Sequence, residues 1–416
     1  MKKIILPLLW ALLAFASLNA IKTGKSIFYA DSYMLRARGV EAAYWNPANL
    51  IPGKYMDVWL PAINAGIGVN NNSLDLDTYN FVVSQDYLDA ADKAKLMSKI
   101  KHDLHASCSG NISIFGFTLA NMSLSSSLTY SGDLSVSKRY LELMLYGNTD
   151  SLYVFGKDRN NAQAISYGDL TFGAGNFTLP FLPDSFPEIR AGFSASILMG
   201  VGTAHSEDFY GSLSSTMDGI SLRQDVTLRT GLGGYGFKSM LGLVSNPIPN
   251  LEVGLTLDNI FGYLKWIGTT EDTNFHISAD SVFITNLDED YYTETHETLD
   301  TEHFSTELPP ELRMAALWNT SKMNFSADYV QAFKNSAVTN STGRLALGVE
   351  AFPAPFLPIH FGLGFGNNSY PWRVSYGIGL SSKTGEFGIS VQSYDSLFPG
   401  KKSKGLSLGS SVRLWL

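Results

Sequence analysis

Apolar and polar residues alternate along much of the second half of this chain. The period of two is clearest at 344–351, 372–381 and 406–416, and it recurs upstream at 189–199. In each segment apolar residues occupy every second position, mostly with Gly, Ser or Arg between them. Successive side chains of a β-strand point to opposite faces, so the pattern predicts strands with one apolar and one polar face.

Such two-faced strands fit either of two all-β architectures. In a soluble sandwich the apolar faces form the core, whereas in an outer-membrane barrel they meet lipid and the polar faces line the lumen. The polar faces here are rich in Gly and Ser, which suits a crowded lumen, and several segments reach the roughly 10 residues that cross a bilayer at a tilt. The chain also ends in an alternating strand at Leu416, which resembles the recognition signal of the barrel-assembly machinery. We therefore expect a closed transmembrane antiparallel outer-membrane β-barrel.

Residues 1–20 have the features of a secretory signal peptide. Lys2 and Lys3 precede an apolar run that ends in small residues at Ala20, so we expect the mature chain to begin near Ile21. An uncleaved anchor would need an apolar run of about 20 residues, and this run is shorter. No other long apolar stretch follows, so any membrane embedding must use strands closed into a barrel.

Amino-acid composition argues against several classes of protein. Charged residues make up 16% of the chain, well below the roughly 25% of soluble globular domains. A net charge of −8 argues against nucleic acid as a partner. The single cysteine, Cys108, excludes an internal disulfide framework.

The segment 44–50, Tyr-Trp-Asn-Pro-Ala-Asn-Leu, lies a short distance after the signal peptide. It resembles the Tyr-Trp-Asn-Pro-Ala-Gly-Leu segment of the long-chain fatty-acid transporter (FadL-like) superfamily, to which PorV-like proteins are related; Asn49 stands where Gly is usual. Residues 257–266 and 308–313 resemble patterns of an uncharacterised group in that superfamily. The resemblance implies about 14 strands in the outer membrane of a Gram-negative-type bacterium. It also implies a hatch at 21–56 that plugs a single barrel domain at 57–416.

In the superfamily the hatch contributes to the ligand pocket and the gate. The candidate ligand and hatch residues are therefore Arg36, Arg38, Tyr44, Trp45, Asn46 and Pro47. Pro47 restricts Asn46 to extended geometry, and the Asn46 side chain can cap the segment that follows. A purely structural role, in which the segment seats the first strand, is the alternative.

Charged residues on the polar strand faces should point into the lumen. We single out Arg190, Arg313, Asp328, Arg344, Glu350, Arg373 and Arg413. One interpretation is a salt-bridge network that stiffens the wall and holds the hatch, since unpaired desolvated charges are costly. The other is a polar group that binds the carboxylate or headgroup of a ligand, a role that suits the Arg fork.

Three segments depart from the strand pattern. Residues 84–102 carry apolar residues at helical spacing and predict a helix with Ser84 as N-cap, and 137–145 predicts a second short helix or a strand. Within the strand pattern, residues 208–229 predict a hairpin. The acidic stretch 285–303 is interpreted either as a divalent-cation site or as a solvated loop; it lacks EF-hand spacing.

No nucleophile elbow, zinc-binding His pair, phosphate loop or CxxC motif occurs, so we expect no enzyme, cofactor or metal. The expected function is passive transport of small hydrophobic compounds such as fatty acids by a monomer whose partners are the lipid bilayer and the assembly machinery. The alternative is a PorV-like shuttle or anchor for secreted proteins, or a structural outer-membrane protein. Transport predicts an apolar tunnel past the hatch, whereas a partner role predicts a sealed lumen and an apolar patch on the external loops.

Overall fold

The computed structural model describes residues 21–415, except for 52–55, 86, 149–151, 180–186, 218, 283–291, 337, 340 and 367–368. The expected signal peptide, part of the acidic stretch and the terminal Leu416 lie outside the described residues. Among the described residues, no helix has the length and hydropathy needed to cross a bilayer.

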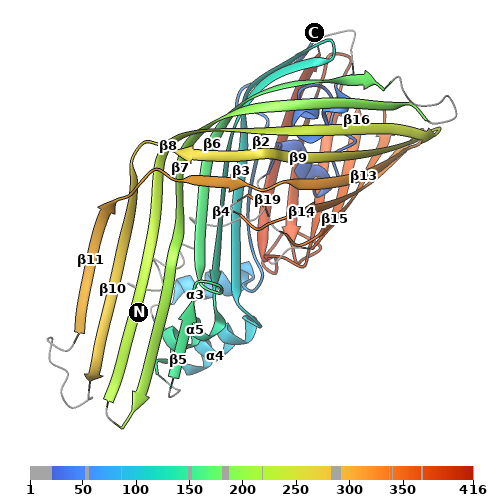
Figure 1. Cartoon of the computed structure of the whole chain (residues 1–416). Coiled ribbons are helices and arrows are strands. Elements are labelled where there is room, and N and C mark those ends of the chain that lie inside the picture. Colours follow the sequence, from blue (N-terminus) through green and yellow to red (C-terminus); the bar gives the residue numbers. More distant parts are fainter. Residues whose placement is uncertain are drawn as a thin grey trace.

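Fourteen antiparallel strands close into a barrel, which confirms the predicted fold class (Figure 1). Each strand pairs with the next, and the circuit closes where Ile67 and Val69 lie opposite Leu408 and Leu406. The strands, in order around the barrel, are β2 (Ala65–Asn71), β3 (Leu104–Leu119), β4 (Met122–Val136), β6 (Asn161–Thr178), β7 (Ile189–Thr216), β8 (Gly219–Ile248), β9 (Leu251–Trp266), β13 (Glu311–Asn319), β14 (Met323–Ala332), β15 (Arg344–Ala354), β16 (Leu357–Phe365), β17 (Trp372–Ser381), β18 (Gly385–Tyr394) and β19 (Gly405–Trp415).

The first barrel strand is interrupted. β1 (Asp57–Trp59) lies in line with β2 and pairs with the same two neighbours, β19 and β3. Between them the chain leaves the ladder at residues 60–64, where Ala62 has a φ of +59°. The side chain of Asn64 restores one lost contact by accepting the Val412 N–H at 2.6 Å.

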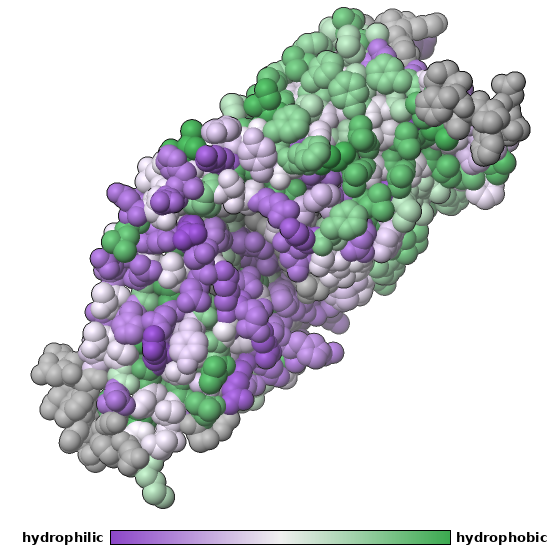
Figure 2. Space-filling model, viewed as in Figure 1, coloured by the Kyte–Doolittle hydropathy of each residue, from purple (hydrophilic) through white to green (hydrophobic). Residues whose placement is uncertain are grey.

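The alternation predicted from the sequence matches the two faces of the wall. In β7, for example, Ser194 and Ser196 are buried in the lumen, whereas Ile197 is 60% exposed on the outside. Figure 2 shows hydrophobic side chains gathered over the half of the molecule that carries β13, and hydrophilic side chains over the half that carries β10 (Thr270–Val282) and β11 (Tyr292–Asp300). The apolar half is the belt that meets lipid.

At one end of the barrel every turn except the 179–188 connection is two or three residues long. Most connections at the other end are longer, and we take that end as the external one. There β7 and β8 continue beyond the barrel and pair with β5 (Leu152–Gly156) and β10, and β10 pairs with β11, so a sheet projects from the rim (Figure 1). β12 (Ser305–Leu308) pairs with β9. The hairpin predicted at 208–229 is thus the outer end of two continuous strands, not a separate unit.

Three helices cover the outer face of β3 and β4 above the apolar belt. The helix predicted within 84–102 is present but shorter, and Ser84 is not its N-cap, because Ser84 is the last residue of a separate helix, α3 (Leu76–Ser84). α4 (Ala90–Lys99) has its own capping box, in which Asp89 and Asp92 each accept the other's backbone N–H. α5 (Lys138–Tyr146) resolves the ambiguous segment as a helix, capped by Ser137.

The acidic stretch is not wholly a loop, because its described residues 292–300 form β11. Every side chain of β11 is exposed. Among the described residues, no group of His, Cys, Asp or Glu is arranged to hold a metal ion.

The hatch fills the lumen at the end with the short turns. It consists of η1 (Gly24–Tyr29), η2 (Gly39–Glu41), α2 (Ala42–Trp45) and η3 (Pro47–Asn49), and none of it pairs with a strand. Its apolar side chains form the largest buried cluster together with Trp59, Val244 and Leu317 of the wall. The core of this protein therefore lies between plug and barrel.

Candidate functional site: the hatch and its seat

Glycines in the wall make room for the backbone of the hatch. A Cβ on Gly175 would lie 1.7 Å from the carbonyl oxygen of Pro47, and one on Gly192 would lie 2.3 Å from the Pro47 carbonyl carbon. Across the lumen, a Cβ on Gly362 would lie 2.3 Å from the carbonyl carbon of Tyr29. Real Cβ atoms do not approach this closely, so the hatch backbone rests against strand positions that only glycine can occupy.

Asn46 and Pro47 organise the last turn of the hatch. Asn46 is extended, with φ −157° and ψ 101°, as the residue before a proline prefers. Its side-chain oxygen accepts the Ala48 N–H at 3.1 Å, and its amide donates to the carbonyl of Leu243 in β8 at 3.2 Å. The Asn-Pro pair therefore caps η3 and fastens it to the wall at the same time.

Ion pairs tie the hatch to the wall all around the lumen. Because the hatch has no ladder hydrogen bonds, these side chains supply much of its polar contact with the barrel. The pairs are Lys22–Asp258 at 2.5 Å, Lys25–Glu386, Asp31–Arg373 at 2.6 Å, Arg36–Glu350 at 3.0 Å and Arg38–Glu252 at 3.1 Å.

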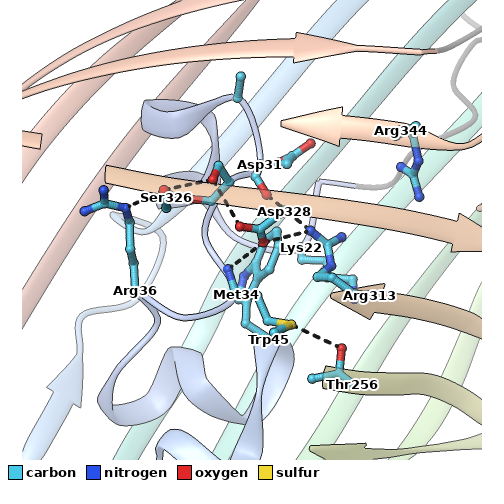
Figure 3. A network of polar contacts seen from close by, with 12 residues as sticks. Lys22, Asp31, Met34, Arg36, Trp45, Thr256, Arg313, Ser326, Asp328 and Arg344 are labelled. Carbon is cyan, nitrogen blue, oxygen red and sulfur yellow. Dashed lines mark hydrogen bonds and ion pairs between the residues drawn. The ribbon is translucent and has the colours of Figure 1, made fainter. Parts of the chain in front are cut away.

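Asp328 of β14 is the centre of the contact network in Figure 3. It accepts the Met34 backbone N–H and the Ser32 hydroxyl, each at 3.0 Å, and lies 3.6 Å from a guanidinium nitrogen of Arg313. The Arg313 guanidinium also lies 4.6 Å from the ring centre of Trp45. One wall carboxylate and one wall arginine thus hold the middle of the hatch and its central aromatic residue.

Tyr44 is held by hydroxyl and carboxylate groups on the neighbouring wall. Its phenol donates to Asp169 at 2.8 Å and accepts from Ser125 at 3.1 Å. Its ring stacks on Trp59 at 5.7 Å between ring centres. Tyr44 therefore links the hatch to β1, β4 and β6.

A small polar cavity lies between the hatch and the external half of the lumen. Its volume is about 60 Å³, room for a few water molecules. Lys238 projects from β8 toward it, with its ammonium 5.9 Å from the ring centre of Tyr167. The charged lining residues are Lys22, Lys238, Arg313 and Arg344 against Asp31, Asp169, Asp258 and Glu311. The cavity is thus electrically balanced and hydrophilic.

The structure brings only some of the predicted lumen residues together. Arg313 and Asp328 contact each other, and Glu350 pairs with the hatch. Arg344 is linked to Arg313, because Glu311 pairs with both of them, at 2.5 and 3.3 Å. The other three arginines also point into the lumen but have separate partners: Arg190 bonds Asn246, Arg373 pairs with Asp31, and Arg413 pairs with Asp57. The set is thus distributed around the wall and does not form one pocket.

Sequence reasoning missed several partners in this network. Asp169 and Glu311 lie on the polar faces of strands, so the two-residue period could have identified them. Lys22, Lys25 and Asp31 lie in the hatch, which has no periodic pattern, and nothing in the sequence marks which wall residues they meet.

No protein-family model matches this sequence, and no curated protein is similar to it. Several solved structures are similar over nearly the whole fold, and two of them follow. The toluene transporter TbuX of Ralstonia pickettii has 10% identity and a TM-score of 0.50, covering 91% of this chain and 94% of its own. A FadL homologue of Pseudomonas aeruginosa has 10% identity and a TM-score of 0.50, covering 96% and 98%. This chain therefore has the fold of a FadL-like outer-membrane β-barrel.

Proposed function

We propose that this protein carries small hydrophobic compounds passively across the outer membrane, with the hatch as its gate. The proposal rests on the way the hatch is held in the lumen. The barrel closes through its own fourteen strands, and the hatch occupies the lumen through side-chain contacts and packing alone. The hatch can therefore shift without opening any strand pair.

The fold comparison supports the class of compound. The similar structure from Ralstonia pickettii is that of a toluene transporter, and the barrel here has the same plugged architecture. The ligand and gating roles expected for Arg36, Arg38, Tyr44, Trp45, Asn46 and Pro47 are part of this proposal.

The present conformation is closed. An apolar tunnel past the hatch was expected for a transporter, but the cavity at the hatch is small and polar within the described part of the chain. Transport thus requires the hatch to move and expose apolar residues that now pack in the plug, such as Phe28 and Trp45.

A reversible tether tests the gate directly. The hydroxyl oxygens of Ser32 in the hatch and Ser326 in β14 lie 2.8 Å apart, so the Ser32→Cys/Ser326→Cys variant places two thiols within bonding reach. In liposomes, oxidation should stop uptake of toluene or a fluorescent fatty acid, and reduction should restore it.

The matched control is Ser393→Cys/Ser403→Cys, whose hydroxyl oxygens are also 2.8 Å apart but join the wall to an external loop. Oxidation of that pair should leave uptake unchanged. If the tethered hatch variant conducts as fast oxidised as reduced, the hatch is not the gate, and the gating part of the proposal fails.

Two observations favour the second function, an anchor for a secreted protein. The lumen is closed at the hatch, as a partner role predicts. The projecting sheet ends in β11, which among the described residues pairs only with β10 and exposes all nine of its side chains. An unpaired strand edge outside the membrane can add a strand from a partner. Under this alternative, the unaltered protein takes up no hydrocarbon. Thr298→Pro in β11 abolishes binding of the secreted partner.

A further inference from the structure

The outer wall is recessed where the first and last strands of the barrel meet. We call this recess, together with the pocket above it, the seam groove. Its lower part has a volume of about 740 Å³ and is almost wholly apolar. Small residues form its floor, because Ala65 lies opposite Ser410 and Gly66 opposite Gly409. Apolar side chains line it: Ile67, Ile112, Ile378, Ile389, Val391 and Leu408.

Two tyrosines bound the lower part of the seam groove, Tyr130 from β4 and Tyr376 from β17. The loop at 395–404 holds Tyr376 in place, because the Tyr376 hydroxyl donates to the carbonyl of Leu397 at 2.7 Å. Its ring stacks on Phe398 at 5.8 Å between ring centres. The loop at 395–404 therefore folds down over the outside of the wall and shapes the groove.

A second pocket of about 450 Å³ continues the groove toward the external rim, between α3 and the loop at 395–404. Its floor includes Val69 and Leu406, the next outward pair above Ile67 and Leu408. The two recesses therefore follow one another along a single seam. Leu74, Leu76, Tyr79 and Pro399 line the upper pocket.

Backbone hydrogen bonds hold the walls of the upper pocket in place. The N–H groups of Leu76 and Asp77 donate to the carbonyls of Ser403 and Lys401, at 3.1 and 2.9 Å. The Asn71 N–H donates to the carbonyl of Lys404 at 2.8 Å. A pocket that is already formed loses little ordering entropy when an occupant binds.

Positive charge gathers at the rim of the upper pocket. Lys404 is paired with Asp395 at 2.6 Å, but the Lys401 side chain is 81% exposed and lies 3.9 Å from Asp77. Lys402 is exposed and, among the described residues, makes no ion pair. The Lys402 ammonium, and the Lys401 ammonium with its long and exposed contact to Asp77, thus lie just above an apolar groove that faces the bilayer.

We propose that the seam groove binds one lipid of the outer leaflet, with an acyl chain in the two recesses and a phosphate-bearing headgroup on Lys401 and Lys402. β2 spans seven residues. At about 3.3 Å per residue and a tilt of about 40° it rises roughly 15 Å, the depth of one leaflet of the hydrocarbon core. Because the recess is concave, it fits an acyl chain better than the convex wall of a second barrel. The site does not depend on movement of the hatch.

Lipid retention tests the proposal. The full-length protein is reconstituted in vesicles of equal parts phosphatidylglycerol and phosphatidylcholine and extracted with detergent, and bound lipids are counted by native mass spectrometry. The protein should retain one lipid and prefer phosphatidylglycerol on the order of tenfold, as expected for two lysines near an anionic headgroup. Leu408→Trp should remove retention of both lipids, whereas Lys401→Gln/Lys402→Gln should keep one lipid and lose the preference.

Two controls separate the site from general lipid contact. Ile197→Trp changes an exposed outer residue of β7 outside the groove, and Lys93→Gln/Lys101→Gln removes two lysines near α4. Both should behave as the unaltered protein. If Leu408→Trp retains as much lipid as Ile197→Trp, the wall binds annular lipid only and the proposal fails. If Leu408→Trp instead abolishes a dimer that carries no lipid, the groove holds a second copy.

Discussion

Arg36 of the hatch and Glu350 of β15 form an ion pair across more than 300 positions of sequence, with Nη1 3.0 Å from Oε2. Neither charge faces bulk water: the two side chains are 5% and 17% exposed. The Tyr29 hydroxyl and the Asn324 amide also donate to Glu350, so the carboxylate joins two segments of the plug to the wall. A rigid contact of this kind makes the seating of the hatch sensitive to single side chains.

Arg36→Ala should loosen the hatch by about 3–5 kcal/mol, because it leaves the Glu350 carboxylate buried without its charge partner. We expect faster proteolysis and faster hydrogen exchange at 24–50, while the barrel keeps its folded mobility on gels. Lys334→Ala is the matched control, since its pair with Glu307 is exposed and contributes only about 0–1 kcal/mol. Equal exchange rates in the two variants would contradict the role given to this pair.

The Arg36→Ala/Glu350→Ala double variant provides a second measurement. Removing both partners leaves no unpaired charge, so its effect should be clearly smaller than the sum of the two single effects. Additive effects would show that the two residues act independently.

Gly192→Ala should displace η3, because the new Cβ would lie 2.3 Å from the Pro47 carbonyl carbon. Overpacking of this kind costs roughly 1–3 kcal/mol. The expected readouts are higher exchange at 46–50 and greater dye leakage from liposomes. Gly400→Ala is the control, since a Cβ there meets nothing within 4 Å. Leakage that matches the control would mean that the glycine seat is not required.

Leu347→Arg should destabilise the barrel in lipid by about 2–4 kcal/mol, because Leu347 faces outward near the middle of its strand. Met323→Arg also changes an outward residue, but one beside a short turn, and should cost about 0–1 kcal/mol. Denaturant unfolding in bilayers measures both. Equal losses of stability in the two variants would mean that the middle of the bilayer does not lie at the level of Leu347.

The docking of α5 should weaken in acid through Asp103. Burial raises the pKa of this carboxyl, but hydrogen bonds from Arg159 and from the Lys138 N–H outweigh it and hold the pKa below its ordinary value. The stabilisation is therefore fully present above the unfolded pKa of about 4 and is lost as the pH falls through the lower folded pKa. Hydrogen exchange at 138–146 should rise in that range, and Asp103→Asn should abolish the pH dependence.

The sequence predicted the wall better than the plug. The two-residue period identified the strands and placed Arg313, Arg344 and Arg373 in the lumen, because a strand's side chains alternate whatever its neighbours are. Helix boundaries were less accurate: Ser84 was a plausible cap, but Asp75 and Asp89 cap the two helices that form. Local capping residues compete, and packing against β3 and β4 selects among them.

By itself, the sequence determined that this chain forms a barrel with an apolar outer face, since alternation, low charge and the absence of a further long apolar stretch leave few alternatives in lipid. Only the tertiary structure decided which charges meet, as with Lys22 and Asp258, and that the plug closes the lumen around a polar cavity. It also decided where the outer wall is recessed. These features join residues hundreds of positions apart, and their free energies depend on distance and burial, which a linear pattern does not contain.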